Sequence, residues 1–224
     1  ALLNKVGSEV SVGQSIGMKD ETAARSFATH NLTLSLIISL VWASVLFAFS
    51  VPIVDFYELK SHIAQDAVNY LRTVSTAFPF VFMSAAATGI FNASGRSKIP
   101  FTINGVGLVI NMVLDPLFIF VFDWKTDGAA WATWIAQACV FTSFVYQLKF
   151  KQILWDNFRF FGKLTKRYTK RIIQIGLPVA TLNTLFAFVN MFLGRTASTV
   201  GGHLGLMAMT TSGQIEAITW NTSQ

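Results

Sequence analysis

Residues 99–122 read IPFTINGVGLVINMVLDPLFIFVF, and this stretch decides the class of fold. It is long enough to cross the hydrocarbon core of a membrane, which takes about 20 helical residues, and its one charged side chain is Asp115. A carboxylate at membrane depth costs roughly 2.5–3.5 kcal/mol on insertion scales, so such a residue is usually retained for a function. We therefore expect a membrane-spanning helix in which Asp115 takes part in the mechanism.

The rest of the chain repeats this pattern of long uncharged runs. Only 12% of its 224 residues are charged, against about 25% in a soluble globular protein. Four further runs of membrane-spanning length contain no Asp, Glu, Lys or Arg: residues 31–54, 73–95, 128–148 and 172–194. A sixth run, 196–215, is uncharged but rich in Gly, Ser and Thr, and is a weaker candidate. Because these runs lack the alternation of a β-barrel, the sequence predicts an all-α integral membrane protein, a polytopic helix bundle with at least five spans.

Lys and Arg are distributed unevenly among the segments that separate these runs. Alternate segments carry thirteen of them on one side of the membrane and three on the other, with Arg72 at a boundary. Because basic loops face the cytoplasm, we expect residues 1–30 and 149–171 to be cytoplasmic, in a multi-pass protein of the plasma membrane, the inner membrane of a bacterium. A topology signal resting on lipid headgroups explains the basic segment 149–171 much better than a nucleic-acid surface does. The expected partner is therefore the lipid bilayer and not nucleic acid.

Prolines, glycines and aromatic residues predict local departures from straight helices. Pro79 is expected to kink the second span, and the glycine-rich stretch 13–17 is expected to be a loop. In residues 149–171, aromatic side chains are interspersed with basic ones, which is typical of an interfacial helix lying on the membrane. A long connection of this kind also marks a boundary between groups of helices, which we place near residue 165.

Asn111 lies one helical turn before Asp115, on the same face of its helix. The segment 123–127 is short, so the spans on either side of it must be antiparallel neighbours. Three positions spaced four residues apart share one face of the following span: Ala129, Thr133 and Gln137. Counting about 1.5 Å per residue from the loop places Asp115 and Thr133 at a similar depth, roughly 9–12 Å below the outer ends of their helices. The two polar stripes would therefore meet if the helices turn these faces toward each other.

Such a cluster can bind a cation in two ways. A carboxyl group removed from water can take up and release a proton near neutral pH. In its ionised form Asp115 could instead hold Na⁺, with oxygens of Asn111 and Thr133 and a backbone carbonyl completing a shell of hard ligands. The alternative is that Asn111 and Thr133 only satisfy Asp115 in a structural contact. The cost of burying an acid without a basic partner in either helix favours a function.

Other polar residues carry weaker indications. Asn183 and Asn190, in the fifth clear run, suit hydrogen bonds between helices, with substrate contact as the alternative. Glu216 is either a second acid within the membrane or an interfacial residue. Three histidines lie at span ends or between spans and lack metal-ligand spacing, so we expect them to be satisfied surface residues: His30, His62 and His203.

Several stretches, taken in order, resemble the multidrug and toxic compound extrusion (MATE) family of transporters: VGQSIG (12–17), TGIFNASGR (88–96), NMVLDPLFIF (111–120), GAAWAT (128–133) and IGLP (175–178). Together they cover essentially the whole chain, as a piece of a twelve-helix protein from the end of the second helix into the eighth. The resemblance implies two six-helix lobes around a central cavity, the multidrug/oligosaccharidyl-lipid/polysaccharide flippase type. Residues 1–165 would be the remainder of the N-lobe, with the end of helix 2, helices 3–6 and the interlobe loop. Residues 166–224 would be the start of the C-lobe, with helix 7 and part of helix 8.

The resemblance also implies a function and a cation site. Members of the family export cationic, amphiphilic compounds in exchange for H⁺ or Na⁺ by alternating access. In many bacterial members an N-lobe site joins an aspartate of the first helix, outside this chain, to four groups that correspond here to Asn111, Asp115, Thr133 and the carbonyl of Ala129. One branch has a glutamate in the seventh helix, where this chain has Phe186, so we expect coupling through the N-lobe. The resemblance thus implies a monomeric antiporter for small organic cations, with H⁺ or Na⁺ as coupling ion, no other cofactor, and the remaining helices of the full-length chain completing it.

Two other functions fit parts of the sequence. A flippase for lipid-linked saccharides, from the same superfamily, would share the helices and the long connection. Such a flippase would line its cavity with several basic residues, for which Arg72 is the only candidate. A membrane-embedded enzyme would need a nucleophile–base pair or a metal site within the spans, and the sequence presents no such set.

Overall fold

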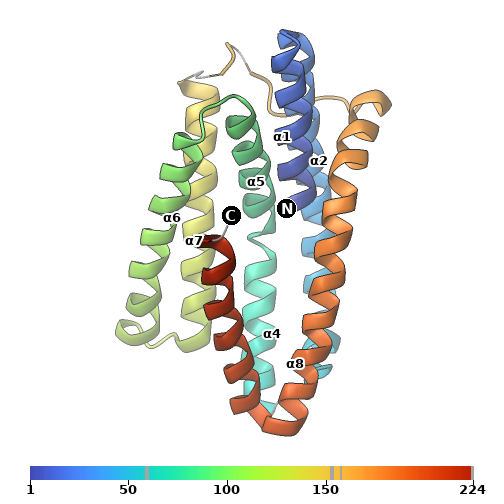
Figure 1. The fold of residues 1–224 in the computed structure, drawn as a ribbon. Helices are drawn as coiled ribbons and strands as arrows, with labels where there is room; N and C mark the ends of the chain where they lie inside the picture. The colour runs from blue at the N-terminus through green and yellow to red at the C-terminus, as the bar shows by residue number, and fades with distance from the viewer. Residues whose placement is uncertain (59–60, 152–153, 157, 223–224) are drawn as a thin grey trace.

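The computed structural model describes residues 1–58, 61–151, 154–156 and 158–222, and among these all side chains except those of 61, 62, 203, 206 and 215–222. Within the described residues the chain is helical and contains no strand (Figure 1). The helices are, in chain order, α1 (Leu2–Gly17), α2 (Glu21–Ala48), α3 (Ser50–Asp55), α4 (Ser61–Ser75), α5 (Phe78–Ala93), α6 (Lys98–Pro116), α7 (Lys125–Val145) and α8 (Lys166–Thr222). Short π-helical turns extend α6 (Leu117–Val121) and α7 (Tyr146–Phe150).

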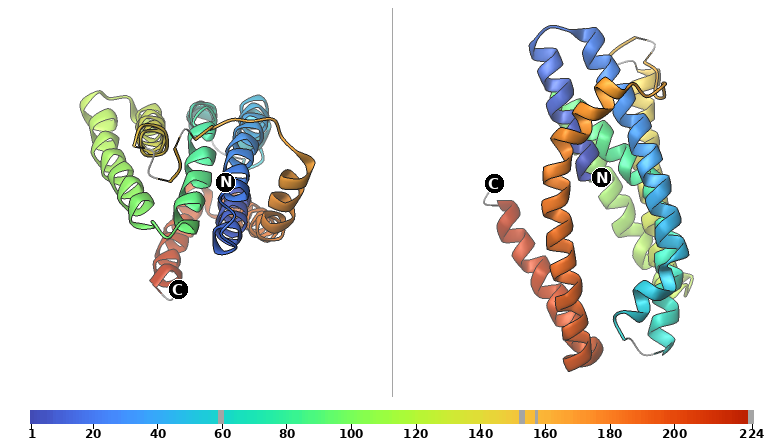
Figure 2. Two further views of the ribbon diagram at one scale, coloured as in Figure 1. Left: turned by 90° about the horizontal axis from the view of Figure 1, so that it is seen from above. Right: turned by 90° about the vertical axis from the view of Figure 1, so that its right-hand side faces the viewer.

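The long helices stand side by side in an elongated bundle (Figure 2). In the described part of the chain, four of them are long and apolar enough to cross a membrane: Glu21–Ala48, Lys98–Val121, Lys125–Phe150 and Lys166–Gly202. A bent pair, Ile63–Ser75 and Phe78–Ala93, makes a fifth span if it counts as one. The expected minimum of five spans is therefore reached when the bent pair is counted as a single crossing.

The second expected span is broken near Pro79 and not kinked at it. α4 ends at Ser75 and α5 begins at Phe78, with a bend of 49° between the two helices. Pro79 occupies the first turn of α5, where the missing backbone N–H costs no intrahelical hydrogen bond. The prediction of a kink inside a continuous helix was wrong, because the proline helps to begin a new helix instead.

The N-terminal region also differs from the prediction of a loop at residues 13–17. Residues 13–17 are the last turns of α1, which is continuous from Leu2 to Gly17. α1 packs against α2, α5 and α8, and its buried face consists mainly of small residues: Gly7, Ser8, Ser11 and Ser15. Small side chains let helices approach closely, so the small residues serve packing. Residues 2–17 are therefore one of the packed helices of the bundle.

α8 consists of two helices joined at Gly202. The backbone of Gly202 has φ 58° and ψ −151°, a conformation that is essentially restricted to glycine. The chain reverses there, and its last part runs back toward the other end of the bundle (Figure 1). The weaker sixth run, 196–215, is therefore not one span, because this break divides it between two helices.

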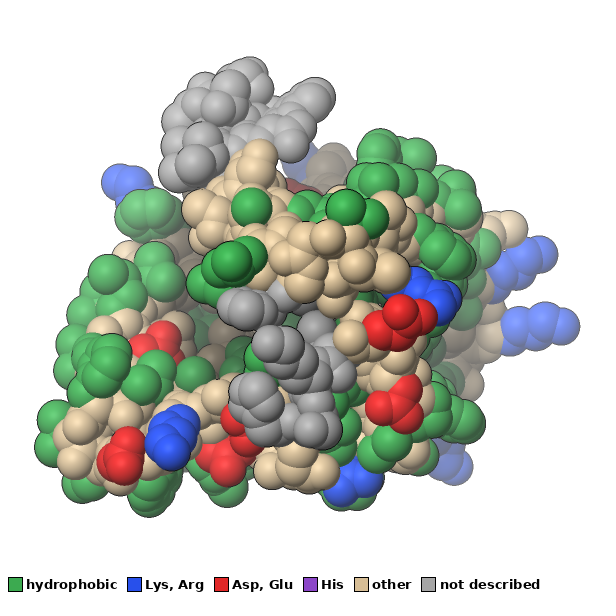
Figure 3. Space-filling model, turned by 90° about the horizontal axis from the view of Figure 1, so that it is seen from below, with side chains coloured by type: hydrophobic (Ala, Val, Ile, Leu, Met, Phe, Trp, Pro, Cys, Tyr) green, Lys and Arg blue, Asp and Glu red, His purple; other side chains and the backbone are tan. Residues whose placement is uncertain are grey.

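The connections between helices gather at the two ends of the bundle. The end drawn at the top of Figure 1, called the basic end from here on, carries three of them: residues 18–20, residues 94–97 and the described residues of the connection between Phe150 and Lys166. The opposite end carries three others: residues 56–58, 122–124 and the break at Gly202. Figure 3 views the opposite end, where acidic side chains lie among hydrophobic ones. The alternation of connections between the two ends agrees with the alternation of basic segments in the sequence.

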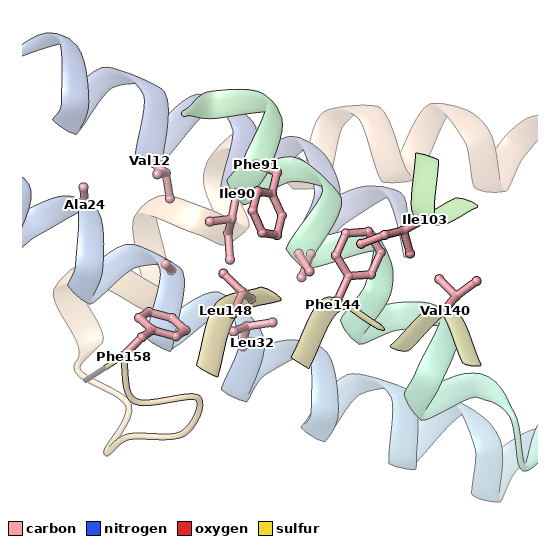
Figure 4. Close-up of a cluster of buried hydrophobic side chains, with 13 residues drawn as sticks. Val12, Ala24, Leu32, Ile90, Phe91, Ile103, Val140, Phe144, Leu148 and Phe158 are labelled. Atoms are coloured by element: carbon pink, nitrogen blue, oxygen red, sulfur yellow. The ribbon is translucent and has the colours of Figure 1, made fainter. Parts of the chain in front are cut away.

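The apolar core lies in the half of the bundle nearer the basic end. Large, fully buried side chains come from three helices that run side by side: Leu32 of α2, Ile90 and Phe91 of α5, and Phe144 of α7, with Leu148 in the π-helical turn that extends α7 (Figure 4). The rings of Phe91 and Phe144 have their centroids 5.9 Å apart, within the range of favourable aromatic pairs. This cluster fixes α5 at the centre of the bundle, between α2 and α7.

The segment 149–171 does not form the expected interfacial helix. Its described residues between Lys151 and Thr165 are not helical. Phe158 is only 6% exposed and belongs to the core cluster, and two further aromatic side chains pack against that cluster: Trp155 and Phe160. These three aromatic side chains cover the end of the core, because burial in the bundle removes their apolar surface from water as well, whereas Phe161 of the same segment is exposed.

Hydrogen bonds fasten this segment to α2. Four of them join the described residues of the two: the Arg25 guanidinium to the carbonyl of Asp156, the Thr29 hydroxyl to the carbonyl of Arg159 (2.8 Å), the amide of Gly162 to the Thr33 hydroxyl (3.2 Å), and the amide of Thr165 to Nε2 of His30 (3.0 Å). His30 is 8% exposed, so it is not the surface residue that we expected. Because its Nε2 accepts a hydrogen bond, its Nδ1 carries the proton and donates to the carbonyl of Ser26, 2.7 Å away.

A buried polar network joins α1 to α2. The side-chain amide of Asn31 donates to the carbonyl of Asn4 (2.6 Å) and to the hydroxyl of Ser8, while the Asn4 amide donates to Oδ1 of Asn31 (3.3 Å). All three residues are completely buried. In an apolar environment such bonds fix the register of two helices, because shifting the helices would leave amides without partners.

We expect Asn31→Ala to lower the free energy of unfolding by about 1 kcal/mol. The substitution leaves the Asn4 amide with only its longer bond to the backbone carbonyl of residue 31 (3.5 Å), and it leaves the buried hydroxyl of Ser8 without the Asn31 amide. Thermal unfolding of the purified protein in detergent measures this effect. Asn183→Ala serves as the control, since the Asn183 side chain is exposed and bonds only within its own helix. Equal midpoints for the two variants would show that the network adds no stability.

Candidate functional site

Asp115 lies at the C-terminal end of α6, in the half of the bundle away from the main core. α6 ends at Pro116, and the chain continues as the π-helical turn Leu117–Val121. Proline cannot donate to the preceding helical turn, and widened turns of this kind are frequent at functional sites. The sequence thus places a carboxylate next to an irregular stretch of backbone within a membrane-spanning helix.

Asn111 and Asp115 form the predicted pair. Nδ2 of Asn111 donates to Oδ1 of Asp115 over 3.4 Å, and both side chains are partly buried. No basic residue forms an ion pair with Asp115 in the described part of the chain. The amide therefore orients the carboxylate and leaves it able to accept a proton or a metal cation.

The second half of the predicted cluster lies on α7. The hydroxyl of Thr133 donates to the carbonyl of Ala129 over 3.0 Å, and both residues are partly buried. Gln137 is one turn further along and is also partly buried. In the described residues no hydrogen bond links these α7 groups to Asn111 or Asp115. The described residues therefore show two polar pairs on two helices that are not joined by a hydrogen bond.

α6 and α7 are close neighbours nonetheless. A methyl group added at Gly107 of α6 would overlap Cγ2 of Val140 of α7, so the two helices approach as closely as glycine allows. The chain connects them through the short segment at residues 122–124. This packing confirms the predicted antiparallel pair, and it leaves the carboxylate of Asp115 and the oxygens of Asn111, Thr133 and Ala129 as the groups that could surround a cation.

The other predicted polar residues make different contacts from those expected. The amide of Asn183 donates to the carbonyl of Val179 (2.9 Å), and that of Asn190 donates to the carbonyl of Phe186 (3.0 Å). Both asparagines are exposed on α8, and in the described residues their side chains bond only within that helix, so hydrogen bonds from them to other helices stay a prediction. The side chain of Glu216 lies outside the described residues.

Two polar contacts between distant segments were not predicted. Nε of Arg72 donates to the Ser50 hydroxyl (2.9 Å), with the guanidinium 5.7 Å from the centroid of the Phe47 ring. Arg195 of α8 forms an ion pair with Glu58, at 2.6 Å between Nη2 and Oε1. Glu58 and Arg195 are separated by more than half of the chain, and nothing in their local sequence indicates the contact.

A comparison with protein families identifies the chain. The family model MatE matches residues 2–117, which are 116 of the 224 residues. The chain belongs to the MatE family. The expected fold class, a part of a polytopic transporter bundle of the MATE type, is thereby confirmed.

Curated relatives agree with this membership. The chain is 29% identical over 191 residues to the "Probable multidrug resistance protein YoeA" of Bacillus subtilis (strain 168), covering 80% of this chain and 40% of that protein. It is 24% identical over 189 residues to the "Multidrug export protein MepA" of Staphylococcus aureus (strain bovine RF122 / ET3-1), covering 84% of this chain and 42% of that one. The chain therefore spans about two fifths of the length of these relatives.

Solved structures share the fold. The inward-facing conformation of a multidrug resistance MATE family transporter of the MOP superfamily superposes with a TM-score of 0.89 at 23% identity, covering 97% of this chain and 50% of that one. An outward-facing conformation of such a transporter gives a TM-score of 0.79 at 24% identity, covering 97% and 48%. The described helices thus form a bundle that makes up about half of such a transporter, and the apolar helices make this a multi-pass membrane protein.

Proposed function

We propose that this chain is part of a cation-coupled antiporter that exports cationic, amphiphilic compounds by alternating access. The observation that carries the proposal is the pair of Asn111 and Asp115 within a membrane-spanning helix. An acid at this place without an ion-pair partner is costly, and cation binding would offset that cost. Membership of the MatE family and the names of the two relatives, for multidrug resistance and multidrug export, support the transport of drugs.

The transporter would contain more helices than this chain, since the relatives are more than twice as long. We propose that residues 1–165 belong to an N-lobe and residues 166–224 to a C-lobe, with the segment before Lys166 as the connection. The compound would bind between the lobes, and the protein would act as a monomer. The basic end of the bundle would face the cytoplasm of the plasma membrane, because Lys and Arg are enriched in its connections.

The chemistry of Asp115 supports both coupling ions. As a carboxylate it would hold Na⁺ together with oxygens of Asn111 and Thr133 and the carbonyl of Ala129, which are ligands of the kind that hard cations prefer. As a carboxylic acid it would carry the proton itself. In either case binding neutralises a charge within the membrane, and the free energy of α6 relative to its neighbours changes with occupancy. This change is what would couple the ion to the rearrangement of the lobes.

Transport under imposed gradients tests the proposal. The full-length protein in proteoliposomes is given a fluorescent organic cation such as ethidium, first under a pH gradient and then under a Na⁺ gradient. We expect one of the two gradients to drive ethidium against its concentration, at several times the rate in liposomes without protein. Equal rates with and without each gradient would contradict cation coupling.

A flippase for lipid-linked saccharides receives no support from Arg72. The flippase alternative needs basic side chains directed into a cavity, whereas the Arg72 guanidinium is bound to Ser50 and lies over the Phe47 ring. The contact holds α4 to the end of α2 and to α3, which is a structural role. We therefore retain drug export as the proposed function.

A further inference from the structure

α8 touches the rest of the bundle in two separate places. Near its start, Ile172 and Gly176 are buried against α1. Residues 181–190 are then all exposed. Gly194 and Ser198 are buried again; they are one turn apart and lie on one face of the helix. The second contact is therefore isolated, and it lies at the opposite end of the bundle from the basic end.

The partner of this second contact is the turn at residues 56–58, which connects the helices α3 and α4. Nη2 of Arg195 lies 2.6 Å from Oε1 of Glu58, and the same guanidinium lies 4.6 Å from the centroid of the Phe56 ring. The ring of Phe56 also meets the ring of Phe192 edge-on, at 5.7 Å between centroids. One arginine thus combines an ion pair with a cation–π contact on the same short turn.

The backbone of the turn takes part as well. The hydroxyl of Ser198, a buried residue, donates to the carbonyl of Tyr57 over 2.8 Å. Glu58 has φ 53°, a left-handed conformation that is uncommon for a residue other than glycine. The amides of Tyr57 and Glu58 donate to carbonyls of Val54 and Asp55, each over 3.0 Å. The turn is therefore a defined structure with its carboxylate and its carbonyl both directed at α8.

We propose that this contact, between residues 56–58 and the face of α8 formed by Phe192, Arg195 and Ser198, is a latch that holds the outer side of the transporter closed. The latch joins the two proposed lobes at the end away from the cytoplasm, so it must open whenever the cavity faces outward. The inference rests on the proposed function, because alternating access is what gives the latch its role.

The strength of the contact suits a latch that opens in every cycle. The side chains of Arg195 and Glu58 are 42% and 51% exposed. Ion pairs with this exposure are weak and are screened by salt, and the other contacts described above are one hydrogen bond, one cation–π contact and one edge-on ring pair. The latch can therefore select the closed state without trapping the transporter in it.

A distance measurement between the two proposed lobes tests the latch without any transport. In the full-length protein, with Cys139 and any other cysteine replaced by serine, spin labels are placed at Thr126→Cys and Val200→Cys. Both positions are exposed at the opposite end, and neither belongs to the latch. Pulsed electron paramagnetic resonance then gives the populations of short and long distances in detergent or nanodiscs.

We expect the labelled parent to show mainly the short distance. Glu58→Gln or Arg195→Gln should at least double the population of the long distance, and high salt should have a similar effect on the parent. The charge exchange Glu58→Arg with Arg195→Glu should restore the parent distribution, which separates the latch from a general loss of folding. Asp66→Asn removes an exposed carboxylate at the same end that does not contact α8, and should change nothing. Identical distributions in the parent and both glutamine variants would overturn the latch.

Cross-linking gives the functional consequence. A disulfide between Tyr57→Cys and Ser198→Cys should reduce ethidium export at least tenfold, and reduction of the disulfide should restore export. The control pair is Tyr57→Cys with Val200→Cys. It should not cross-link, because the exposed side chain of Val200 points away from the turn. Full export by the cross-linked protein would contradict the latch while leaving the proposed antiporter intact. A protein that shows the expected distances but exports nothing under any gradient would keep the latch as a contact between the lobes and reject the proposed function.

Discussion

Asp115→Asn is expected to reduce gradient-driven export of organic cations to the level of liposomes without protein, a loss of at least tenfold. Asparagine has nearly the same shape as aspartate and can still accept the hydrogen bond from Asn111. It cannot take up a proton or supply a negative charge to Na⁺. The substitution therefore removes the coupling chemistry while preserving the packing at the end of α6, and the variant should be produced in normal amounts. Ethidium export from proteoliposomes containing the full-length protein measures the effect.

Asp127→Asn is the matched control for this prediction. Asp127 is an exposed acid in the first turn of α7, close in sequence to the candidate site and outside the apolar part of the helix. The same loss of charge there should leave export within twofold of the parent. Undiminished export by the Asp115→Asn variant would show that the carboxylate is not the coupling group.

Gly89→Val should prevent the N-terminal helices from packing, with a loss of about 3 kcal/mol in the free energy of unfolding. Gly89 lies in α5 against α1, and a Cβ atom there would overlap the carbonyl oxygen of Lys5 and come within 2.9 Å of Cβ of Ser8. The obstacle is mainly backbone, so no side-chain rotation relieves it. Either the helices separate, which also strains the polar network between α1 and α2, or the protein does not reach its folded state.

The amount of monodisperse protein after extraction with detergent, together with its thermal midpoint, measures this prediction. Gly105→Val provides the control, because nothing lies within 4 Å of a Cβ atom built at Gly105 of α6. The two variants share the change in helix propensity, so the difference between them reports the contact of α5 with α1. Equal midpoints for both would show that this close approach does not limit stability.

The spans of this protein could be predicted because the membrane leaves few alternatives. A run of more than 20 residues with at most one charge, as in 99–122, must be helical within a membrane and is long enough to cross it. Predictions for the residues outside these spans were less accurate. The glycines of residues 13–17 indicated a loop, yet they lie in the last turns of α1, a helix whose buried face of small residues, such as Gly7, packs closely against its neighbours. The aromatic residues of the segment 149–171 indicated a membrane surface, yet Phe158 fills the end of the core.

One part of the candidate site could be predicted from the sequence, and another part could not. The pair of Asn111 and Asp115 could be predicted because a spacing of four residues fixes two side chains on one face of a helix. Whether the α7 stripe faces that pair depends on the rotation of two helices about their axes, which neither the spacing nor the loop length determines. The contact of Glu58 with Arg195 depends on how α8 packs against a turn that is distant in sequence. Each of the two segments contributes one charged residue to it, which is not enough to predict the pair.

The direct test of cation coupling at Asp115 is the flux of the ion that moves in exchange for the drug. Proteoliposomes containing the full-length protein are given an outward or inward gradient of ethidium alone, and the entry or exit of H⁺ and of ²²Na⁺ is followed. The account predicts that ethidium movement drives one of the two ions in the opposite direction, and that Asp115→Asn abolishes this flux. Ethidium transport without counter-movement of either ion, or an unchanged ion flux in the variant, would contradict it.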